Sequence, residues 1–339
     1  MKIPYRTRRA MGRAAIVLAV IALALLMIWL CWLLWLGRFV VYTSDGVYFD
    51  FNRTTLDISG EPAVQPEIQE TVSIYYNEGE NAVNVSRELT QINGYSISTE
   101  DLEGDISLLR SQIQTLETDM AIMVEVKGAF GAFNYSSSVG EYFNDAVDLK
   151  QVDGLIQQLT KGNHYTIAKV TAFQDYYYGL NNVDEGLFST AGAYLWRDDL
   201  GCYWLSPSSQ QVVGYLAQIA LELKALGFDE VVFDQFLFPS SEGYRFGGDR
   251  QEALFAAADT LIDTCASNAF AVSFVSTSSF QLPEGRSRLY LKNVDAGDAA
   301  SVAAGVAVPD TAINLVFLTE FHDTRFDVYG VLRPITAMK

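Results

Sequence analysis

Four acidic side chains lie at or near the ends of short apolar runs that are typical of buried β-strands. A pair of carboxylates in surroundings that favour different protonation states can supply a proton donor together with a nucleophile or base. The sequence therefore predicts acid–base chemistry built on strand-end carboxylates. The candidate catalytic residues are Asp234, Glu320, Glu125 and Asp175.

Asp234 is the first choice among them because of the segment that carries it. Residues 227–239 read GFDEVVFDQFLFP, in which a short β-branched and aromatic run is followed by the aspartate. An amphipathic run over 209–226 precedes this segment and stops at Gly227, as expected for a helix C-terminus. The segment therefore predicts a helix, a tight turn and a buried strand that ends in a carboxylate.

Strand alternation sorts the residues of this run onto two faces. In a barrel of parallel strands, Val231 and Phe233 would face the outer helices, while Glu230, Val232 and Asp234 would face inward. Asp234 would then lie at the C-terminal mouth, where such barrels carry their chemistry.

Elsewhere in the chain, strand-like runs alternate with helical ones, which indicates a parallel sheet with right-handed crossovers. Long loops follow several strands at the same end, and no phosphate-binding glycine motif occurs. We therefore predict the α/β class and a TIM-like (β/α) barrel, compact or incomplete, with seven strands recognised and an eighth inferred. The predicted strands cover 92–98, 120–127, 165–173, 231–233, 269–275, 289–294 and 314–318, and the predicted helices cover 101–116, 149–160, 209–226, 250–266 and 298–304.

The N-terminal part contains an uncharged apolar run at 14–36. As a helix it would extend about 35 Å, enough to cross a bilayer core of about 30 Å. Most of the nearby basic residues precede the run, which orients the N-terminus to the cytoplasm. The sequence thus predicts a single-pass signal anchor in the cell membrane, with a cytoplasmic basic tail at 1–13 and an extracytoplasmic C-terminal domain.

Between the anchor and the barrel, residues 39–88 predict a small β-rich collar or linker. Its clearest signal is Asp45-Gly46 between alternating apolar residues, which is typical of a hairpin. The barrel itself is predicted over 90–339.

Composition limits the classes of partner and site. The formal net charge is −18, and none of the 41 acidic residues lies in the basic first 38 positions. An acidic domain of this kind repels phosphate backbones, so no nucleic acid is expected as a partner. With two histidines and no metal-ligand spacing, we predict no metal site and no cofactor. Cys202 and Cys265 could pair, but one possible pair is no disulfide framework.

Several blocks together resemble one family, the bacterial glycoside-hydrolase-like (β/α) barrel domain of unknown function. Residues 227–239 resemble the family hallmark GFDEIQFDYIRFP. The segments 203–207, 167–175 and 123–127 resemble three further family blocks, in the family order. This resemblance covers about 90–245 and implies a barrel fold with carbohydrate-directed chemistry.

The sequence departs from the family pattern at positions that matter for chemistry. Leu237 stands where the family has an arginine, Lys169 replaces an arginine, Gln174 a lysine and Glu125 an aspartate. A C-terminal family block, Pro-Met-x-Tyr-Pro, has no counterpart. These departures leave the fold supported and the catalysis open.

The resemblance and the anchor predicted at 14–36 together imply a membrane-anchored glycoside hydrolase acting on cell-envelope or environmental polysaccharide through a carboxylate pair that includes Asp234. In such chemistry one acid donates a proton and the other acts as nucleophile, stabiliser or base. For the proton donor we consider Glu320, which continues the alternation of Asn314, Val316 and Leu318 on one face of the last predicted strand. Glu125 and Asp175 are the other strand-end acids. The alternative is a catalytically inactive barrel that binds a glycan or an envelope protein.

Basic and aromatic residues near the strand ends are candidates for substrate binding. A lysine beside an acid would lower the pKa of that acid, which suits a nucleophile. Aromatic rings in the long loop after 165–173 could stack on sugar rings. The structural alternatives are an ion-pair layer inside the mouth and aromatic rings that pack the loop. The candidates are Lys127, Lys169, Tyr177, Trp196 and Trp204.

Overall fold

The computed structural model describes residues 27, 29, 40–43, 46–49 and 88–337. The chain divides into two compact units, one up to Tyr76 and one from Asn77 onward.

In the first unit, the predicted hairpin is present. Strand β1 (Val40–Thr43) pairs antiparallel with β2 (Gly46–Phe49). The predicted anchor at 14–36 lies outside the described residues except for positions 27 and 29, which are helical. Among the helices that are described, none combines the length and apolar character needed to span a membrane.

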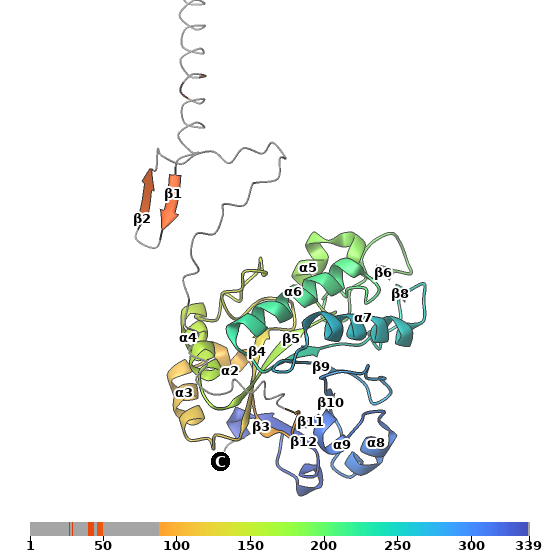
Figure 1. Cartoon of the computed structure of the whole chain (residues 1–339). Helices are drawn as coiled ribbons and strands as arrows, with labels where there is room; N and C mark the ends of the chain where they lie inside the picture. The colour runs from red at the N-terminus through yellow and green to blue at the C-terminus, as the bar shows by residue number, and fades with distance from the viewer. Residues whose placement is uncertain (1–26, 28, 30–39, 44–45, 50–87, 338–339) are drawn as a thin grey trace, which may run out of the picture. The chain divides into compact units, whose positions relative to one another are not determined.

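The second unit is a closed barrel of eight parallel strands (Figure 1). All seven predicted strands are confirmed. The eighth, β12, pairs with β11 on one side and with β3 on the other and so closes the sheet. The barrel strands are β3 (Asn93–Ile97), β4 (Ala121–Lys127), β5 (Tyr165–Thr171), β7 (Glu230–Asp234), β9 (Ala271–Val275), β10 (Leu289–Lys292), β11 (Leu315–Leu318) and β12 (Gly330–Pro334).

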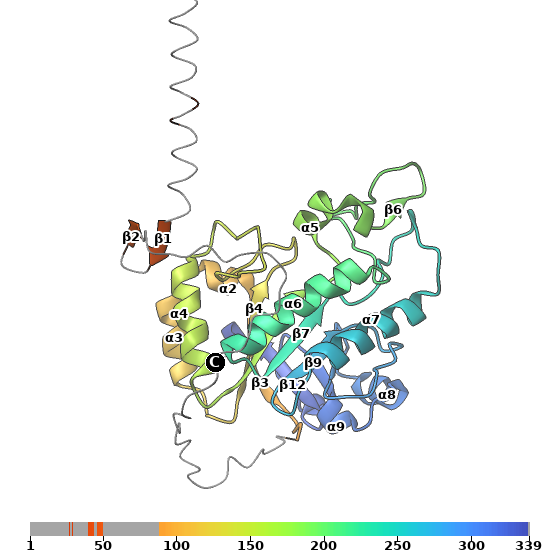
Figure 2. The ribbon, with the colours of Figure 1, turned by 45° about the horizontal axis from the view of Figure 1, so that its top comes forward.

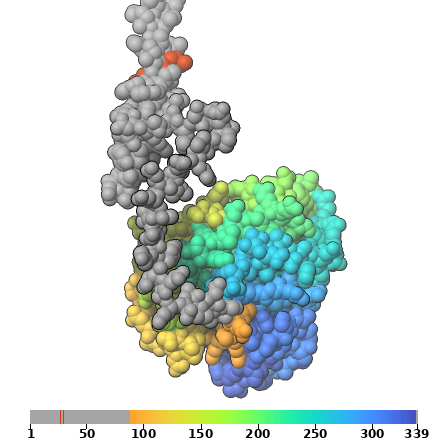
Figure 3. Space-filling model, in the orientation of Figure 1, coloured from red at the N-terminus to blue at the C-terminus, as the bar shows by residue number. Residues whose placement is uncertain are grey.

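Helices cover the barrel unevenly. Helices α6 and α7 lie side by side, and α3 packs against α4 (Figures 1 and 2). Side chains of α6 and α7 form a continuous surface in the space-filling view (Figure 3). The connection from β9 to β10, residues 276–288, contains no helix. The helices are α2 (Thr99–Glu103), α3 (Ile106–Gln114), α4 (Leu149–Thr160), α5 (Tyr176–Asn181), α6 (Gln210–Leu226), α7 (Arg250–Cys265), α8 (Ala299–Gly305) and α9 (Thr311–Asn314).

One predicted helix is split. The run expected over 101–116 forms two helices because Gly104 ends α2 and the Asp105 carboxylate caps α3, accepting hydrogen bonds from the backbone N–H groups of Ser107 and Leu108. The apolar spacing that predicted one helix is kept across the break, since Leu102 and Ile106 are both buried.

The predicted faces of β7 are confirmed. Val231 and Phe233 belong to the large apolar cluster between the strands and the helices. Val232 belongs to a separate cluster inside the barrel, which includes Ile167 and Val316 from other strands. On the inward face of β7, Val232 therefore lies in this apolar layer and Asp234 lies above it, at the C-terminal end of the strand.

A polar cluster lies inside the barrel below this layer, at the N-terminal ends of the strands. Glu230 and Arg288 form an ion pair in which both side chains are fully buried. Tyr165 and Tyr290 each donate a hydroxyl hydrogen bond of 2.9 Å to the Glu230 carboxylate. Burial, together with the charge of Glu230, raises the pKa of both tyrosines, so they stay neutral donors. We call these four residues the basal cluster.

Helix α6 ends as its sequence predicts. Ser209 caps the start through its hydroxyl, and Gly227 ends the helix in the left-handed conformation at φ +96°. A side chain at this φ is strained, since only glycine adopts it without steric cost.

We expect Gly227→Ala to lower the free energy of unfolding by about 1 kcal/mol, because alanine must adopt a positive φ. The matched control is Gly214→Ala in the middle of the same helix, where an added methyl group meets no atom within 4 Å. That change should stabilise by about 0.5–1 kcal/mol through helix propensity. Urea denaturation measures both, and equal effects of the two changes would contradict the expectation.

Candidate active site

Asp234 lies at the C-terminal mouth of the barrel as the last residue of β7. Lys292, at the end of β10, donates hydrogen bonds of 2.7 and 2.5 Å to its two carboxylate oxygens. Lys169, on the neighbouring strand β5, lies 3.5 Å from Oδ2 of the same carboxylate and 2.9 Å from Oε1 of Glu125 on β4. These four residues, Asp234, Lys292, Lys169 and Glu125, are called the mouth cluster.

The two carboxylates of the mouth cluster are close enough to act on one bond. Because one oxygen of each lies within 3.5 Å of the same Lys169 nitrogen, these oxygens are no more than about 7 Å apart. That limit is compatible with the spacing of roughly 5–9.5 Å between the carboxyl groups of glycoside hydrolases. Glu125 is also held by the backbone N–H of Thr99, which donates 2.9 Å to Oε2.

The electrostatics of the mouth cluster keep Asp234 ionised. Burial of its carboxyl group opposes ionisation, but the charges of Lys292 and Lys169 outweigh it and lower the pKa of Asp234. Burial likewise disfavours the charged form of Lys169, yet the charges of Glu125 and Asp234 raise the pKa of that ammonium. An ionised aspartate suits a nucleophile or an electrostatic stabiliser.

Backbone strain is concentrated beside the mouth cluster. Within the described residues, only Gln235 and Asn293 are non-glycine residues with positive φ, at 53° and 55°. They directly follow Asp234 and Lys292, and the N–H of Gln235 donates a 2.7 Å hydrogen bond back to Asp234. Such conformations cost of order 1–3 kcal/mol and cluster at functional sites.

A cavity of about 350 Å³ opens beside Asp234 and Lys292. Gln235, Asn293 and Leu237 also line it. Leu237, which stands where the family has an arginine, gives the cavity an apolar wall at that position. The cavity is large enough for a single sugar ring.

The structure does not bring Lys127 and Asp175 to the mouth. Alternation predicts that Lys127 shares a face with Glu125, and this is wrong. The pairing of β4 with β5 shifts between Glu125 and Lys127, so that Val126 forms a β-bulge. The bulge turns Lys127 outward, where its ammonium lies 5.6 Å from the centre of the Tyr215 ring on α6.

Lys127 and Asp175 instead form an ion pair of 2.7 Å, with both side chains fully buried. Asp175 also caps α5 by accepting a 2.8 Å hydrogen bond from the N–H of Tyr178. Their contacts are those of a structural pair beside the mouth, and neither enters the proposal below.

The three aromatic candidates lie in the connection between β5 and α6, and each is engaged by the protein. The ring of Tyr177 stacks on Tyr142 at 4.4 Å. Trp196 is mostly buried against Tyr244. The indole of Trp204 donates a 2.8 Å hydrogen bond to Asp198. Loop packing, the structural alternative, thus describes the contacts of Trp196 and Trp204.

Comparison with known proteins identifies the fold and the family. A family model described as "Putative glycosyl hydrolase domain" matches residues 99–282, which is more than half of the chain. The chain belongs to this family. None of the curated protein sequences matches it.

Solved structures with the same fold include glycoside hydrolases. An α-galactosidase from Lactobacillus brevis has a TM-score of 0.50 and 12% identity, over 76% of this chain and 39% of that one. A GH36 α-galactosidase from Geobacillus stearothermophilus has a TM-score of 0.50 and 13% identity, over 74% and 40%. A hypothetical protein from Ruminiclostridium thermocellum is 20% identical over 53% of this chain and 96% of that one, with a TM-score of 0.46. The chain spans about two fifths of the length of these α-galactosidases, and the likeness concerns the barrel fold.

Lys292 is the mouth residue that sequence reasoning missed. It lies outside the part matched by the family, yet it makes the shortest contacts with Asp234. A signal was present, because Tyr290 and Lys292 alternate on the predicted sixth strand just as Val232 and Asp234 do on β7.

Glu320, the candidate considered for the proton donor, is exposed and follows β11 by two residues. Leu318, which continues the same alternation, pairs with Lys292 across the neighbouring strands. Glu320 thus lies beyond the C-terminal end of β11, the strand next to that of Lys292.

The described residues also bear on metal ligands and on the two cysteines of the barrel. No group of three or more potential metal ligands occurs there. Cys202 and Cys265 are both buried and free, so these two do not form a disulfide.

The stabilising effect of Asp234 is expected to depend on pH. Its pKa is lower in the folded than in the unfolded chain, where aspartate titrates near pH 4, so the stabilisation is full above about pH 4. It is lost as the pH falls through the folded pKa. We therefore expect the difference in unfolding free energy between the wild type and Asp234→Asn to be smaller at pH 3 than at pH 7. Urea denaturation at both values measures it, and a difference independent of pH would contradict the ion pairing.

Proposed function

We propose that the chain is a glycoside hydrolase that cleaves a polysaccharide at the mouth of its barrel, with Asp234 as nucleophile or electrostatic stabiliser. The observation that carries this proposal is an ionised, nearly buried carboxylate on the wall of a cavity at the C-terminal end of a glycosyl-hydrolase-family barrel. Lys292 and Lys169 hold this carboxylate in one orientation. The developing positive charge of an oxocarbenium-ion-like transition state would be stabilised by such an anion.

Glu320 is the proton donor in this proposal. Both oxygens of Glu125 already accept hydrogen bonds, one from Lys169 and the other from the N–H of Thr99. Glu320 is exposed and has no such competing partners among the described residues, which leaves its carboxyl group available for a leaving oxygen.

The location proposed for the enzyme follows from residues 14–36, which would anchor it in the cell membrane with the barrel outside. Cell-envelope or environmental polysaccharide would then be within reach. Release of the full chain from membranes by alkaline carbonate would contradict this anchoring.

One observation favours a second candidate function, a catalytically inactive barrel that binds a glycan or an envelope protein. Both carboxylates of the mouth cluster are already bound by ammonium or N–H donors, and Leu237 removes the charge that the family arginine supplies. A binding module needs no free proton donor.

A screen for hydrolysis separates the two functions. The full chain is incubated with a panel of envelope and plant polysaccharides, and newly formed reducing ends are counted for the wild type, Asp234→Asn, Glu320→Gln and Glu125→Gln. Hydrolysis that is lost in Asp234→Asn supports the enzyme. Equal release by the wild type and Asp234→Asn would remove Asp234 from the reaction, and binding without release by any protein would favour the inactive barrel.

A further inference from the structure

A second pocket lies away from the mouth cluster, in the connection between β5 and α6. It is open, has a volume of about 690 Å³, and shares no lining residue with the cavity at Asp234. This connection pairs through β6 (Phe188–Ser189) with β8 (Tyr244–Arg245), which follows β7. The residues that line the pocket all come from the connection after β5, and pairing with β8 ties this connection to the loop after the neighbouring strand β7.

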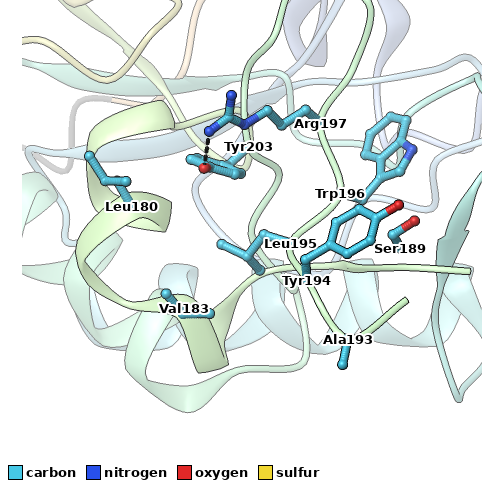
Figure 4. A pocket seen from close by; sticks show the side chains of 9 residues that line it. All are labelled: Leu180, Val183, Ser189, Ala193, Tyr194, Leu195, Trp196, Arg197 and Tyr203. Carbon is cyan, nitrogen blue, oxygen red and sulfur yellow. Dashed lines mark hydrogen bonds between the residues drawn. The ribbon is translucent and has the colours of Figure 1, made fainter. Parts of the chain in front are cut away.

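The walls of this pocket are apolar and partly exposed. Leu180 and Val183 form one side, and Leu195 and Tyr194 lie opposite (Figure 4). Tyr194 is 57% exposed, and no stacking of its ring on another aromatic ring occurs among the described residues. Its ring offers a flat surface for the C–H face of a sugar.

Arg197 closes one end of the pocket. Its guanidinium lies 4.5 Å from the centre of the Tyr203 ring (Figure 4). It also lies 5.7 Å from the centre of the Tyr176 ring, and these two rings stack on each other at 5.3 Å. Stacking and one hydrogen bond, to the hydroxyl of Tyr203, hold the guanidinium plane in place. The orientation is thus set before any ligand arrives.

The donors of Arg197 are largely uncommitted. Arg197 is exposed, and within the described residues it forms no ion pair although the chain has 41 acidic residues. A guanidinium has five N–H donors, and the only hydrogen bond that Arg197 makes to a described residue goes to Tyr203. A planar fork of free donors matches the two oxygens of a carboxylate.

We propose that this pocket binds a sugar residue that carries a carboxylate, with Tyr194 under the sugar ring and Arg197 paired with the carboxylate. The inference rests on the proposed function, because it makes the substrate an acidic polysaccharide of the uronic-acid class. The acidic charge of the domain opposes long-range attraction of such a polymer, so the selectivity comes from the local contact with Arg197.

Binding measured without turnover tests the proposal. The full chain carrying Asp234→Asn is titrated calorimetrically with tetramers of galacturonate, glucuronate and mannuronate, and with their carboxyl-reduced neutral counterparts. We expect at least one uronate tetramer to bind roughly tenfold or more tightly than its neutral counterpart, as charge-assisted hydrogen bonds predict. Arg197→Gln should remove this preference, and Arg197→Lys should restore only part of it because lysine lacks the planar fork.

The control is Arg110→Gln, which removes a positive charge on α3, far along the chain from the pocket, and should leave binding unchanged. Absence of binding by all three uronates, equal binding of acidic and neutral tetramers, or a preference that survives Arg197→Gln would each overturn the proposal. If binding depends on Arg197 but the wild type hydrolyses nothing, the hydrolase function is wrong and the uronate-binding pocket stands. If hydrolysis depends on Asp234 but Arg197→Gln has no effect, the uronate-binding pocket is wrong and the hydrolase function stands.

Discussion

Asp234→Asn is expected to lower kcat on the polysaccharide that the screen identifies by about 10³-fold or more, a loss of roughly 4 kcal/mol in transition-state stabilisation. A neutral amide can neither attack the anomeric carbon nor stabilise positive charge on the sugar ring. The substitution keeps the size of the side chain and an acceptor for the N–H of Gln235. Lys169 keeps Glu125 as a partner, and Lys292 is partly exposed to water.

The control for this experiment is Asp259→Asn, the same chemical change at an exposed position of α7. It should leave kcat unchanged. Far-ultraviolet circular dichroism of both variants establishes that the barrel is retained. A kcat for Asp234→Asn within tenfold of the wild type, on a protein that is folded, would exclude Asp234 as nucleophile.

Arg288→Met is expected to lower the free energy of unfolding by about 3–5 kcal/mol, the usual cost of leaving one member of a buried ion pair without its partner. Glu230 would then be a fully buried carboxylate whose remaining donors are Tyr165 and Tyr290. The substitution also leaves the backbone carbonyls of Thr90 and Ile313 without the guanidinium that now donates to them.

Two comparisons make this result specific to the basal cluster. In the double variant Arg288→Met with Glu230→Leu the unpaired charge is absent, so part of the lost stability should return. Arg325→Met breaks an exposed pair with Asp323, in which the arginine side chain is 59% exposed, and should leave the urea midpoint unchanged. Equal midpoints for the wild type and Arg288→Met would show that the basal cluster does not stabilise the barrel.

The strand order and the faces of β7 follow from local patterns in the sequence. Because side chains alternate between the two faces of a strand, Val231 and Phe233 must share one face, and the sequence predicts that this face packs against helices. The structure places both residues in the apolar cluster between the strands and the helices. Helix α6 likewise begins and ends where Ser209 and Gly227 predict, because capping is an interaction over three or four residues.

The same alternation failed for β4, where the physical cause is a β-bulge. Val126 is one extra residue in the strand, so the side chain of Lys127 points to the opposite face from the one that alternation predicts. Lys127 therefore forms a buried ion pair with Asp175 and does not reach the mouth. Nothing in the residues from Met123 to Lys127 marks the bulge, since it depends on how β4 pairs with β5.

The sequence by itself determined a barrel-forming pattern, an aspartate at the end of its fourth strand and the aspartate's place at the mouth. Only the tertiary structure decided which charges surround that aspartate. Lys292 is 58 positions away in the chain and becomes its closest partner because closure of the barrel brings the ends of β7 and β10 to the same rim. Contacts of this kind depend on the register and closure of all eight strands, which local sequence patterns do not encode.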